Sequence, residues 1–150
     1  MAAGDIILTA GMVVKKVTVK ANEDIELGEL VVNDGNGFLA ATAALAALSN
    51  PGVALEAHDY SEATVHTISV LFKGVVEAQK KADTSGYAVY AGNKLTISAT
   101  AGEAAPFAMT DVTSSVTETT VEAAMLANQA CFGTVYEDSA SAATTVKVIL

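Results

Sequence analysis

The chain has 150 residues, a formal net charge of −9, eight lysines and no arginine. This length allows one well-buried core, or two small lobes that share a core. The acidity opposes contact with polyanions. Without arginine the chain also lacks the planar donor that holds phosphates in a bidentate manner, so nucleic acid is excluded as an expected partner. Hydrophobic residues make up 51% of the chain, but there is no tryptophan, so small and β-branched side chains must build the core.

Residues 1–16 are predicted to form an N-terminal arm. Its apolar side chains could add a strand to the exposed sheet edge of a neighbouring protein, and the alternative is that the arm pairs within its own domain. The start of the chain has no basic residue before its apolar stretch, which is atypical of a secretion signal. No apolar run is long enough to cross a membrane, so no membrane partner is expected. The residues expected to bind a partner are Ile6, Ile7, Leu8, Val13 and Val14.

Residues 17–150 are predicted to form a single β domain made of two similar units, at about 17–74 and 75–150. The segment GELVVNDGNGFLAATA aligns with GYAVYAGNKLTISATA, so that Gly28 corresponds to Gly86. A second pair, GVALEAHDYSEATVHTISVL and GTVYEDSASAATTVKVIL, ends in alternating Val, Ile and Thr. Internal similarity of this kind indicates a duplicated β unit.

Turn and helix signals separate the predicted strands. The Asp-Gly pair at Gly35 and the Gly-Asn pair at Gly92 supply residues that adopt positive φ, which predicts tight hairpins at both places. A short helix is predicted before Pro51, and a longer helix is predicted to begin with a capping box formed by Thr119 and Glu122. The predicted fold class is therefore mainly β: a small β-barrel or β-tulip-like domain built from two similar β units, with one or two short helices in the inserts.

Candidate chemistry is sparse, and no catalytic residue, metal site or cofactor is expected. His58 lies next to Asp59 in a segment with the composition of a solvated turn. His66 lies on the apolar face of an alternating strand, where a hydrogen-bonded structural histidine is expected, and Cys131 is predicted to be a buried small hydrophobic residue. The segment NDGNG has the composition of a calcium loop but lacks its spaced ligands, so it is interpreted as a solvated turn.

The two-unit pattern resembles the capsid decoration, or cement, proteins of tailed bacteriophages and related viruses. In this pattern G-x-x-V is followed by a Gly-Asn turn, then by G-x-A-x-E and an alternating Val/Thr strand, over roughly residues 17–150. The long second insert, residues 102–130, departs from the short form of the pattern. The resemblance implies a small β-barrel or β-tulip core and a homotrimer that binds the major capsid protein. It also implies a place on the outer surface of the virion, after synthesis in the host cytoplasm.

The function implied by this resemblance is stabilisation of a capsid by a structural protein, with neither an enzyme activity nor a small-molecule substrate. One alternative is a head-fibre protein or another minor self-assembling capsid component, in which Val- and Thr-rich strands stack between subunits. Another is a trimeric β-barrel that binds a ligand or acts as an enzyme, such as a nucleotide hydrolase. The lack of arginine and of a phosphate-binding loop disfavours this last class.

Overall fold

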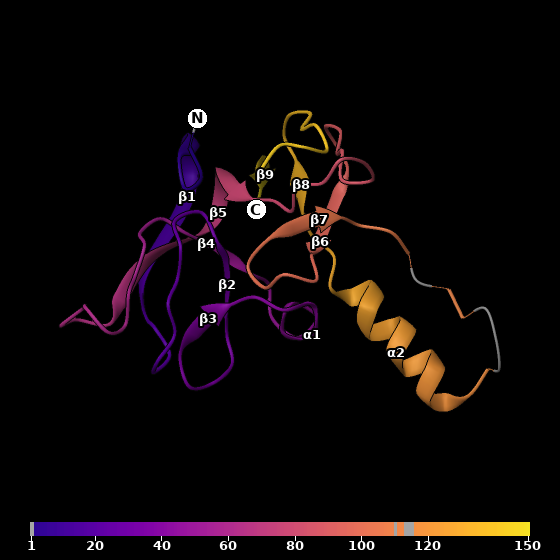
Figure 1. Ribbon diagram of the computed structural model, residues 1–150, viewed down its shortest axis with the longest axis horizontal. Coiled ribbons are helices and arrows are strands. Elements are labelled where there is room, and N and C mark those ends of the chain that lie inside the picture. Colours follow the sequence, from indigo (N-terminus) through magenta and orange to yellow (C-terminus); the bar gives the residue numbers. More distant parts are fainter. Residues whose placement is uncertain (1, 110, 113–115) are drawn as a thin grey trace.

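The computed structural model is mainly β and describes residues 2–109, 111–112 and 116–150, apart from the side chains of residues 7–10. Its strands form one curled antiparallel sheet, and the longer helix extends away from the sheet at one end (Figure 1). The predicted fold class, a mainly β, small-barrel-like domain, is confirmed. In the described residues the elements are β1 (Ile6–Thr18), β2 (Leu30–Asn33), β3 (Phe38–Ala40), α1 (Ala43–Ala46), β4 (Gly52–Ala54), β5 (Thr67–Gln79), β6 (Lys94–Ile97), β7 (Ala104–Pro106), α2 (Glu118–Gln129), β8 (Phe132–Val135) and β9 (Thr145–Ile149).

The first unit, from β1 to the first half of β5, curls into a ring of strands. In this ring β1 pairs with β5, β5 with β4, β4 with β2, and β2 with β3. A parallel bridge between Val19, which follows β1, and Phe38 of β3 brings the two ends of the ring together. The strands β1 and β3 therefore come together through two residues that are far apart along the chain.

The second unit, from the second half of β5 to β9, repeats these pairings in the same order. Here β5 pairs with β9, β9 with β8, β8 with β6, and β6 with β7. A parallel bridge between Lys80, which follows β5, and Ala104 of β7 corresponds to the bridge between Val19 and Phe38. The prediction of two similar β units is confirmed, and β5 belongs to both of them.

The strand β5 passes from the first unit to the second at Gly74, which has a φ of 139°. Before this residue Leu71 pairs with β4, and after it Val75 pairs with β9. Glycine adopts this positive φ without a Cβ clash, which permits the bend. The boundary expected between residues 74 and 75 therefore lies inside a shared strand, and β1 likewise extends across the arm boundary expected at residue 16.

The sequence alignment of the first half of the two units was wrong in register. The amide of Gly28 donates to the carbonyl of Ala54 at 2.8 Å, and the amide of Gly92 donates to the carbonyl of Val135 at 2.9 Å. Gly92, and not Gly86, is therefore the counterpart of Gly28. Gly92 lies in a turn that precedes β6, so the hairpin predicted there is also wrong, whereas β2 and β3 do pair across the predicted turn at Gly35.

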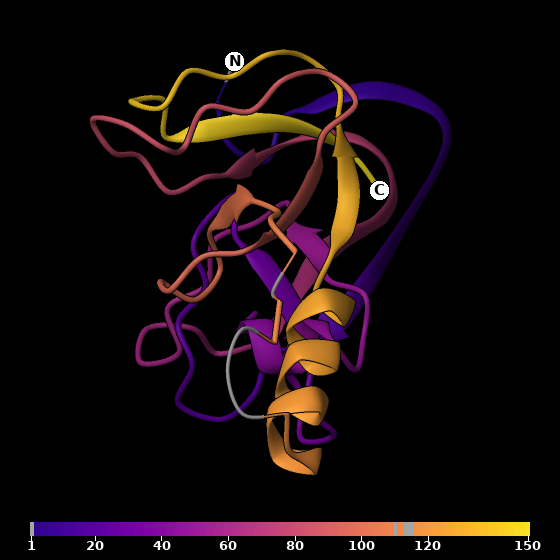
Figure 2. The ribbon, with the colours of Figure 1, turned by 90° about the vertical axis from the view of Figure 1, so that its right-hand side faces the viewer.

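Both predicted helices form, with one difference at a helix start. The long helix α2 is capped by Thr117, whose side chain accepts the amide of Thr120 at 3.2 Å, so it begins two residues before the predicted capping box of Thr119 and Glu122. The helix lies beside α1 (Figure 2) and buries Ala124, whereas Met125 is largely exposed.

Among the described side chains, two apolar clusters stabilise the fold. Members of one come from the first unit alone, and those of the other come from both units, so the two units pack as one body. The predicted alternation along β5 is confirmed, because Ile68 and Val70 lie in the first cluster and Leu71 in the second. The first cluster contains Val17, Val19, Ile25, Val31, Ala54, Ile68 and Val70.

Candidate functional site

The N-terminal strand β1 is an edge strand of the first unit (Figure 1). Its inner side pairs with β5, so the segment pairs within its own chain in this structure. In the described part of the chain, the outer side has a backbone bond only beyond the end of the strand, where the amide of Lys20 donates to the carbonyl of Phe38 at 2.9 Å. An edge of this kind presents N–H and C=O groups that another strand can pair with.

The pairing of β1 with β5 contains a large irregularity. Leu8 pairs with Val75 and Val13 pairs with Lys73, so residues 9–12 lie opposite Gly74 alone. The extra residues bulge away from the ladder at the same place where β5 bends. The first part of β1 is therefore held less regularly than Val14–Thr18, which pairs residue by residue.

Three consecutive apolar residues on β1 are exposed. Met12 is 41% exposed, Val13 50% and Val14 39%. Successive strand residues point to opposite faces, so exposure of all three means that neither face of the strand is covered here. Ile6, by contrast, is partly buried against the shared core, and the side chains of the predicted site residues Ile7 and Leu8 lie outside the described residues.

Lysines continue this exposed surface. Lys15 and Lys16 follow Val14 along β1, and Lys73 lies across from Val13 on β5, all three with exposed side chains. Three of the eight lysines of an acidic chain therefore lie on this strand pair. We call Met12, Val13, Val14, Lys15, Lys16 and Lys73 the β1 edge. Met12 and the lysines were not among the binding residues expected from the sequence. Met12, Lys15 and Lys16 are nevertheless adjacent in the chain to the predicted residues Val13 and Val14.

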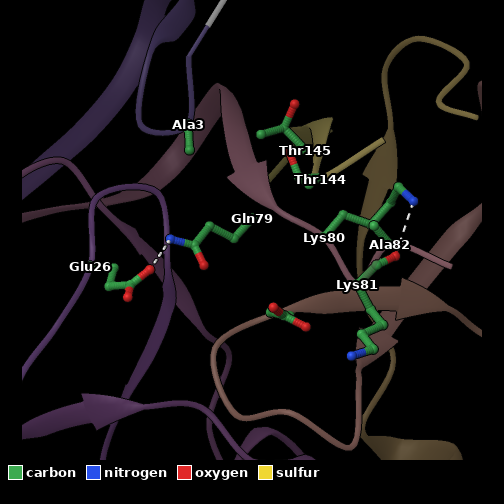
Figure 3. Close-up of a pocket in the computed structure, with 9 residues that line it drawn as sticks. Ala3, Glu26, Gln79, Lys80, Lys81, Ala82, Thr144 and Thr145 are labelled. Atoms are coloured by element: carbon green, nitrogen blue, oxygen red, sulfur yellow. Dashed lines mark hydrogen bonds between the residues drawn. The ribbon is translucent and has the colours of Figure 1, made fainter. Parts of the chain in front are cut away.

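A cleft of about 420 Å³ lies where the two units meet (Figure 3). On one side, the Gln79 side-chain amide donates to Glu26 Oε2 at 3.1 Å and to the carbonyl of Leu27 at 3.0 Å. These bonds tie the end of β5 to the turn before β2. The remaining lining residues are Ala3, Lys80, Lys81, Ala82, Glu103, Thr144 and Thr145.

The side chain of Lys80 is almost fully buried at the edge of this cleft, at 2% exposed. Its ammonium donates to the carbonyls of Lys81 and Tyr87, both at 3.1 Å, and of Ser141 at 3.3 Å. Burial lowers the pKa of this amine below its ordinary value, because the charged form loses solvation. The three acceptors are backbone groups of two loops, so Lys80 joins those loops to β5.

Carboxylates lie close together beside this cleft, where Glu26 and Glu103 are lining residues and Glu29 is their neighbour. Burial raises the pKa of Glu29, and the neighbouring carboxylates of Glu26 and Glu103 raise it further. Glu29 Oε2 accepts the amide of Glu26 at 2.8 Å, and its side chain lies against Gly102, where an added Cβ would come within 2.2 Å of it. The Glu29 side chain thus packs the first unit closely against the second.

The structure brings the two histidines together. His58 is 7% exposed, so the predicted solvated turn is wrong for this residue. Its Nε2 lies 3.3 Å from Nδ1 of His66, and the ring of Tyr60 stacks on His66 with centroids 3.9 Å apart. The chain folds back between β4 and β5, and the backbone of His58 bonds to Ile25, which buries the ring. No local sequence signal reports this fold-back.

The NDGNG segment uses its oxygen atoms within its own turn. Asn33 Oδ1 accepts the amide of Gly35 at 2.8 Å, and Asp34 Oδ1 accepts the amide of Asn36 at 2.9 Å. The ammonium of Lys20 lies 2.7 Å from Asp34 Oδ2, and this hydrogen bond holds the pKa of the Asp34 carboxyl below its ordinary value. Within the described ranges, no group of three or more His, Cys, Asp or Glu side chains is placed to hold a metal ion.

Cys131, which lies between α2 and β8, is partly exposed, so the prediction of a buried residue is wrong. Among the residues with described positions, no helix has both the length and the apolar character needed to span a membrane.

Comparison with known proteins adds no family to this description. No protein-family model matches the chain. No curated protein matches it either. The β1 edge and the residues around it are therefore the features of this chain that bear on its function.

Proposed function

We propose that this protein is a structural virion protein that binds the outer surface of a viral capsid and stabilises it, with the major capsid protein as its partner. The observation that supports this most is the β1 edge, an open strand edge with three consecutive exposed apolar residues. In this proposal the protein acts by binding, not by catalysis.

Strand addition supplies the mechanism. A strand or extended arm of the capsid protein pairs with the open backbone of β1, which supplies main-chain hydrogen bonds, while Met12, Val13 and Val14 bury apolar area against it. The lysines Lys15 and Lys16 attract a partner surface that carries carboxylates. The irregular first part of β1 can also leave β5 and pair with the capsid subunit itself.

The body of the protein suits this role because its two units share an apolar cluster. A rigid body loses little conformational freedom when it binds. A homotrimer is part of the proposal, since three linked β1 edges would raise the effective concentration of each weak contact.

The β1 edge is best tested by substitutions that keep the strand. Deletion of residues 2–14 would also remove Ile6, which packs against the core, and so would alter the fold as well as the edge. The double variant Val13→Thr and Val14→Thr changes the exposed edge alone and is the more specific test. It keeps β-branched side chains and removes exposed apolar groups, and we expect capsid affinity to fall by about tenfold. The matched control is Val65→Thr, which changes a valine that is 68% exposed outside β1.

The measurement is co-sedimentation of the purified protein with capsids isolated from the source culture, after mass spectrometry of those particles. Recovery of the protein in a fixed ratio to the major capsid protein supports the proposal, as does loss of binding in the double variant alone. Absence of the protein from particles contradicts it. Growth of the purified protein into filaments would instead favour the minor self-assembling component, because an open edge can also pair with another copy.

A further inference from the structure

The imidazole pair at the β4–β5 connection has a geometry that suits a metal ion. From the positions of His58 and His66, we propose that the first unit binds one divalent transition metal ion of the class that imidazole prefers, such as Zn²⁺, Ni²⁺ or Cu²⁺. The ligand atoms are Nε2 of His58 and Nδ1 of His66. This proposal is independent of capsid binding, and it differs from the expectation, drawn from the sequence, that no metal site is present.

The distance between the two nitrogens is the first argument. Tetrahedral zinc with Zn–N bonds of about 2.0–2.1 Å requires ligand nitrogens about 3.3–3.4 Å apart. Nε2 of His58 and Nδ1 of His66 are 3.3 Å apart. The rings therefore lie at the spacing of two adjacent ligands before any ion is bound.

The distance between the ring centres is the second argument, because a hydrogen bond could produce the same nitrogen spacing. Two imidazoles bound in their ring planes to one tetrahedral ion have centres about 5.2 Å apart. A straight N–H···N bond of the observed length would place the centres about 5.6 Å apart. The observed separation of the two ring centres is 5.3 Å, which is closer to the value for two ligands of one ion than to the value for a straight hydrogen bond.

Both rings are held in place by the fold. The backbone of His58 exchanges two hydrogen bonds with Ile25, each 2.8 Å long. The ring of Tyr60 lies on the ring of His66 at an angle of 17°. The amide of Tyr60 in turn donates to Asp24 Oδ1 at 2.7 Å, which fixes the residue that supports His66. A site whose ligands are already ordered loses little freedom when the ion binds.

Charge around the pair favours a cation. Asp24 contacts the Tyr60 amide, and Asp59 directly follows His58 in the chain. Asp59 Oδ1 accepts the hydroxyl of Ser61 at 2.7 Å and the amide of Ser61 at 2.9 Å. The negative net charge of the whole chain adds to the attraction.

The chain supplies two ligands and sets a modest affinity. In the described ranges no third His, Cys, Asp or Glu completes the site, so water takes the other positions. When the ion binds, the proton of His58 must lie on Nδ1, which is buried and has no hydrogen-bond partner among the described atoms. Metal sites without an acceptor behind the imidazole are weaker by about 10–100-fold, so the affinity falls well below that of a structural zinc site.

The second unit provides an internal comparison. Its bridge between Val89 and Ser139 corresponds to the bridge between Ile25 and His58. The carbonyl of Thr144 accepts the amide of Lys80 as the carbonyl of His66 accepts that of Val19. Serine and threonine therefore occupy the places of the two histidines, and the expected stoichiometry is one ion per chain.

The experiment uses the full chain, which contains only these two histidines. Calorimetric titration with Zn²⁺ and Ni²⁺ at neutral pH measures the stoichiometry and affinity, and the magnetic resonance spectrum of bound Cu²⁺ counts the coordinated nitrogens. We expect one ion per chain with two nitrogen ligands. His66→Gln should weaken binding by about tenfold or more and leave one nitrogen, because it removes a ligand at a partly exposed position.

The control is Glu62→Gln, which removes a carboxylate from the same connection and should leave the affinity unchanged. Histidine-detected nitrogen spectra of the unmodified chain add a readout that needs no substitution: Zn²⁺ should shift Nε2 of one ring and Nδ1 of the other. Binding that survives His66→Gln, or an ion that shifts neither nitrogen, overturns the proposal, as does the absence of binding in the unmodified chain.

Discussion

Lys80 occupies in the second unit the place that Val19 occupies in the first. The amide of Val19 donates to His66 and that of Lys80 donates to Thr144, and each residue forms the parallel bridge of its unit. Val19 packs in an apolar cluster, whereas Lys80 directs a buried ammonium at three carbonyls. The same backbone position therefore stabilises one unit by apolar packing and the other by hydrogen bonds.

Lys80→Met should destabilise the protein by about 1–3 kcal/mol, because the stem of the side chain is kept while three partly buried carbonyls lose a donor. The measurement is the urea midpoint at neutral pH. Lys81→Met is the matched control, since it alters a neighbouring lysine that is less buried, and it should change stability by less than about 0.5 kcal/mol. Equal stability of the Lys80 variant and the unmodified protein would show that the three bonds contribute nothing.

The same lysine predicts a rise of stability with pH. Burial lowers the folded-state pKa of Lys80 below the ordinary value of 10.5, so between these two values the unfolded chain binds more protons than the folded one. Stability from this group therefore increases as the pH rises toward 10.5. Carboxylate partners raise the folded-state pKa of Lys20 and Lys147 above 10.5, so the stability that these two ion pairs contribute is lost only at pH values above 10.5. Urea midpoints between neutral pH and 10.5 should rise less in Lys80→Met.

Glu29→Gln should raise the melting temperature at neutral pH. Burial raises the folded-state pKa of Glu29 above 4.5. Between 4.5 and this raised pKa the folded state binds more protons than the unfolded state, so the protein loses stability as the pH rises through that interval. Glutamine removes the charge and retains an oxygen that can accept the amide of Glu26. Calorimetric scans should show that the gain disappears below about pH 4, where the carboxyl is neutral in both states. Glu23→Gln is the control, and a gain of the same size there would contradict the explanation.

Gly74→Ala should destabilise the protein by about 1–3 kcal/mol. A residue with a side chain is strained at a φ of 139°, and the new Cβ would lie 3.3 Å from the Cβ of Met12. Because β5 belongs to both units, the loss should appear as a lower midpoint of a single unfolding transition. Chemical denaturation followed by circular dichroism measures this, and an unchanged midpoint would mean that β5 can bend elsewhere.

Thr117→Ala should shorten or unfold α2 with little effect on the sheet. The capping box between Thr117 and Thr120 contributes about 1 kcal/mol, and the helix buries only Ala124 among its described side chains. Helices of this length are marginal in water without packing. Helical circular dichroism should decrease while the urea midpoint of the sheet stays the same. Coupled loss of both would show that α2 stabilises the core.

The local pattern of the sequence determined the fold class and the repeated order of elements. Period-two alternation identified the two faces of β5, which pack in different clusters, and the turn at Gly35 joins paired strands as predicted. Both helices were predicted because their capping and proline signals are local. The starting point of α2 was missed because Thr117 and Thr119 offer similar hydroxyl caps, and only the packed helix selects between them.

Tertiary structure alone decided the register of the repeat, the burial of Lys80 and the pairing of His58 with His66. Many small residues make several alignments equally good, and hydrogen bonds from Gly28 and Gly92 select the true one. The two histidines meet because the β4–β5 connection folds back beside Ile25, a contact that is distant along the chain. The spacing of residues along the chain does not predict such contacts, because they form only when the two rings of strands pack together around β5.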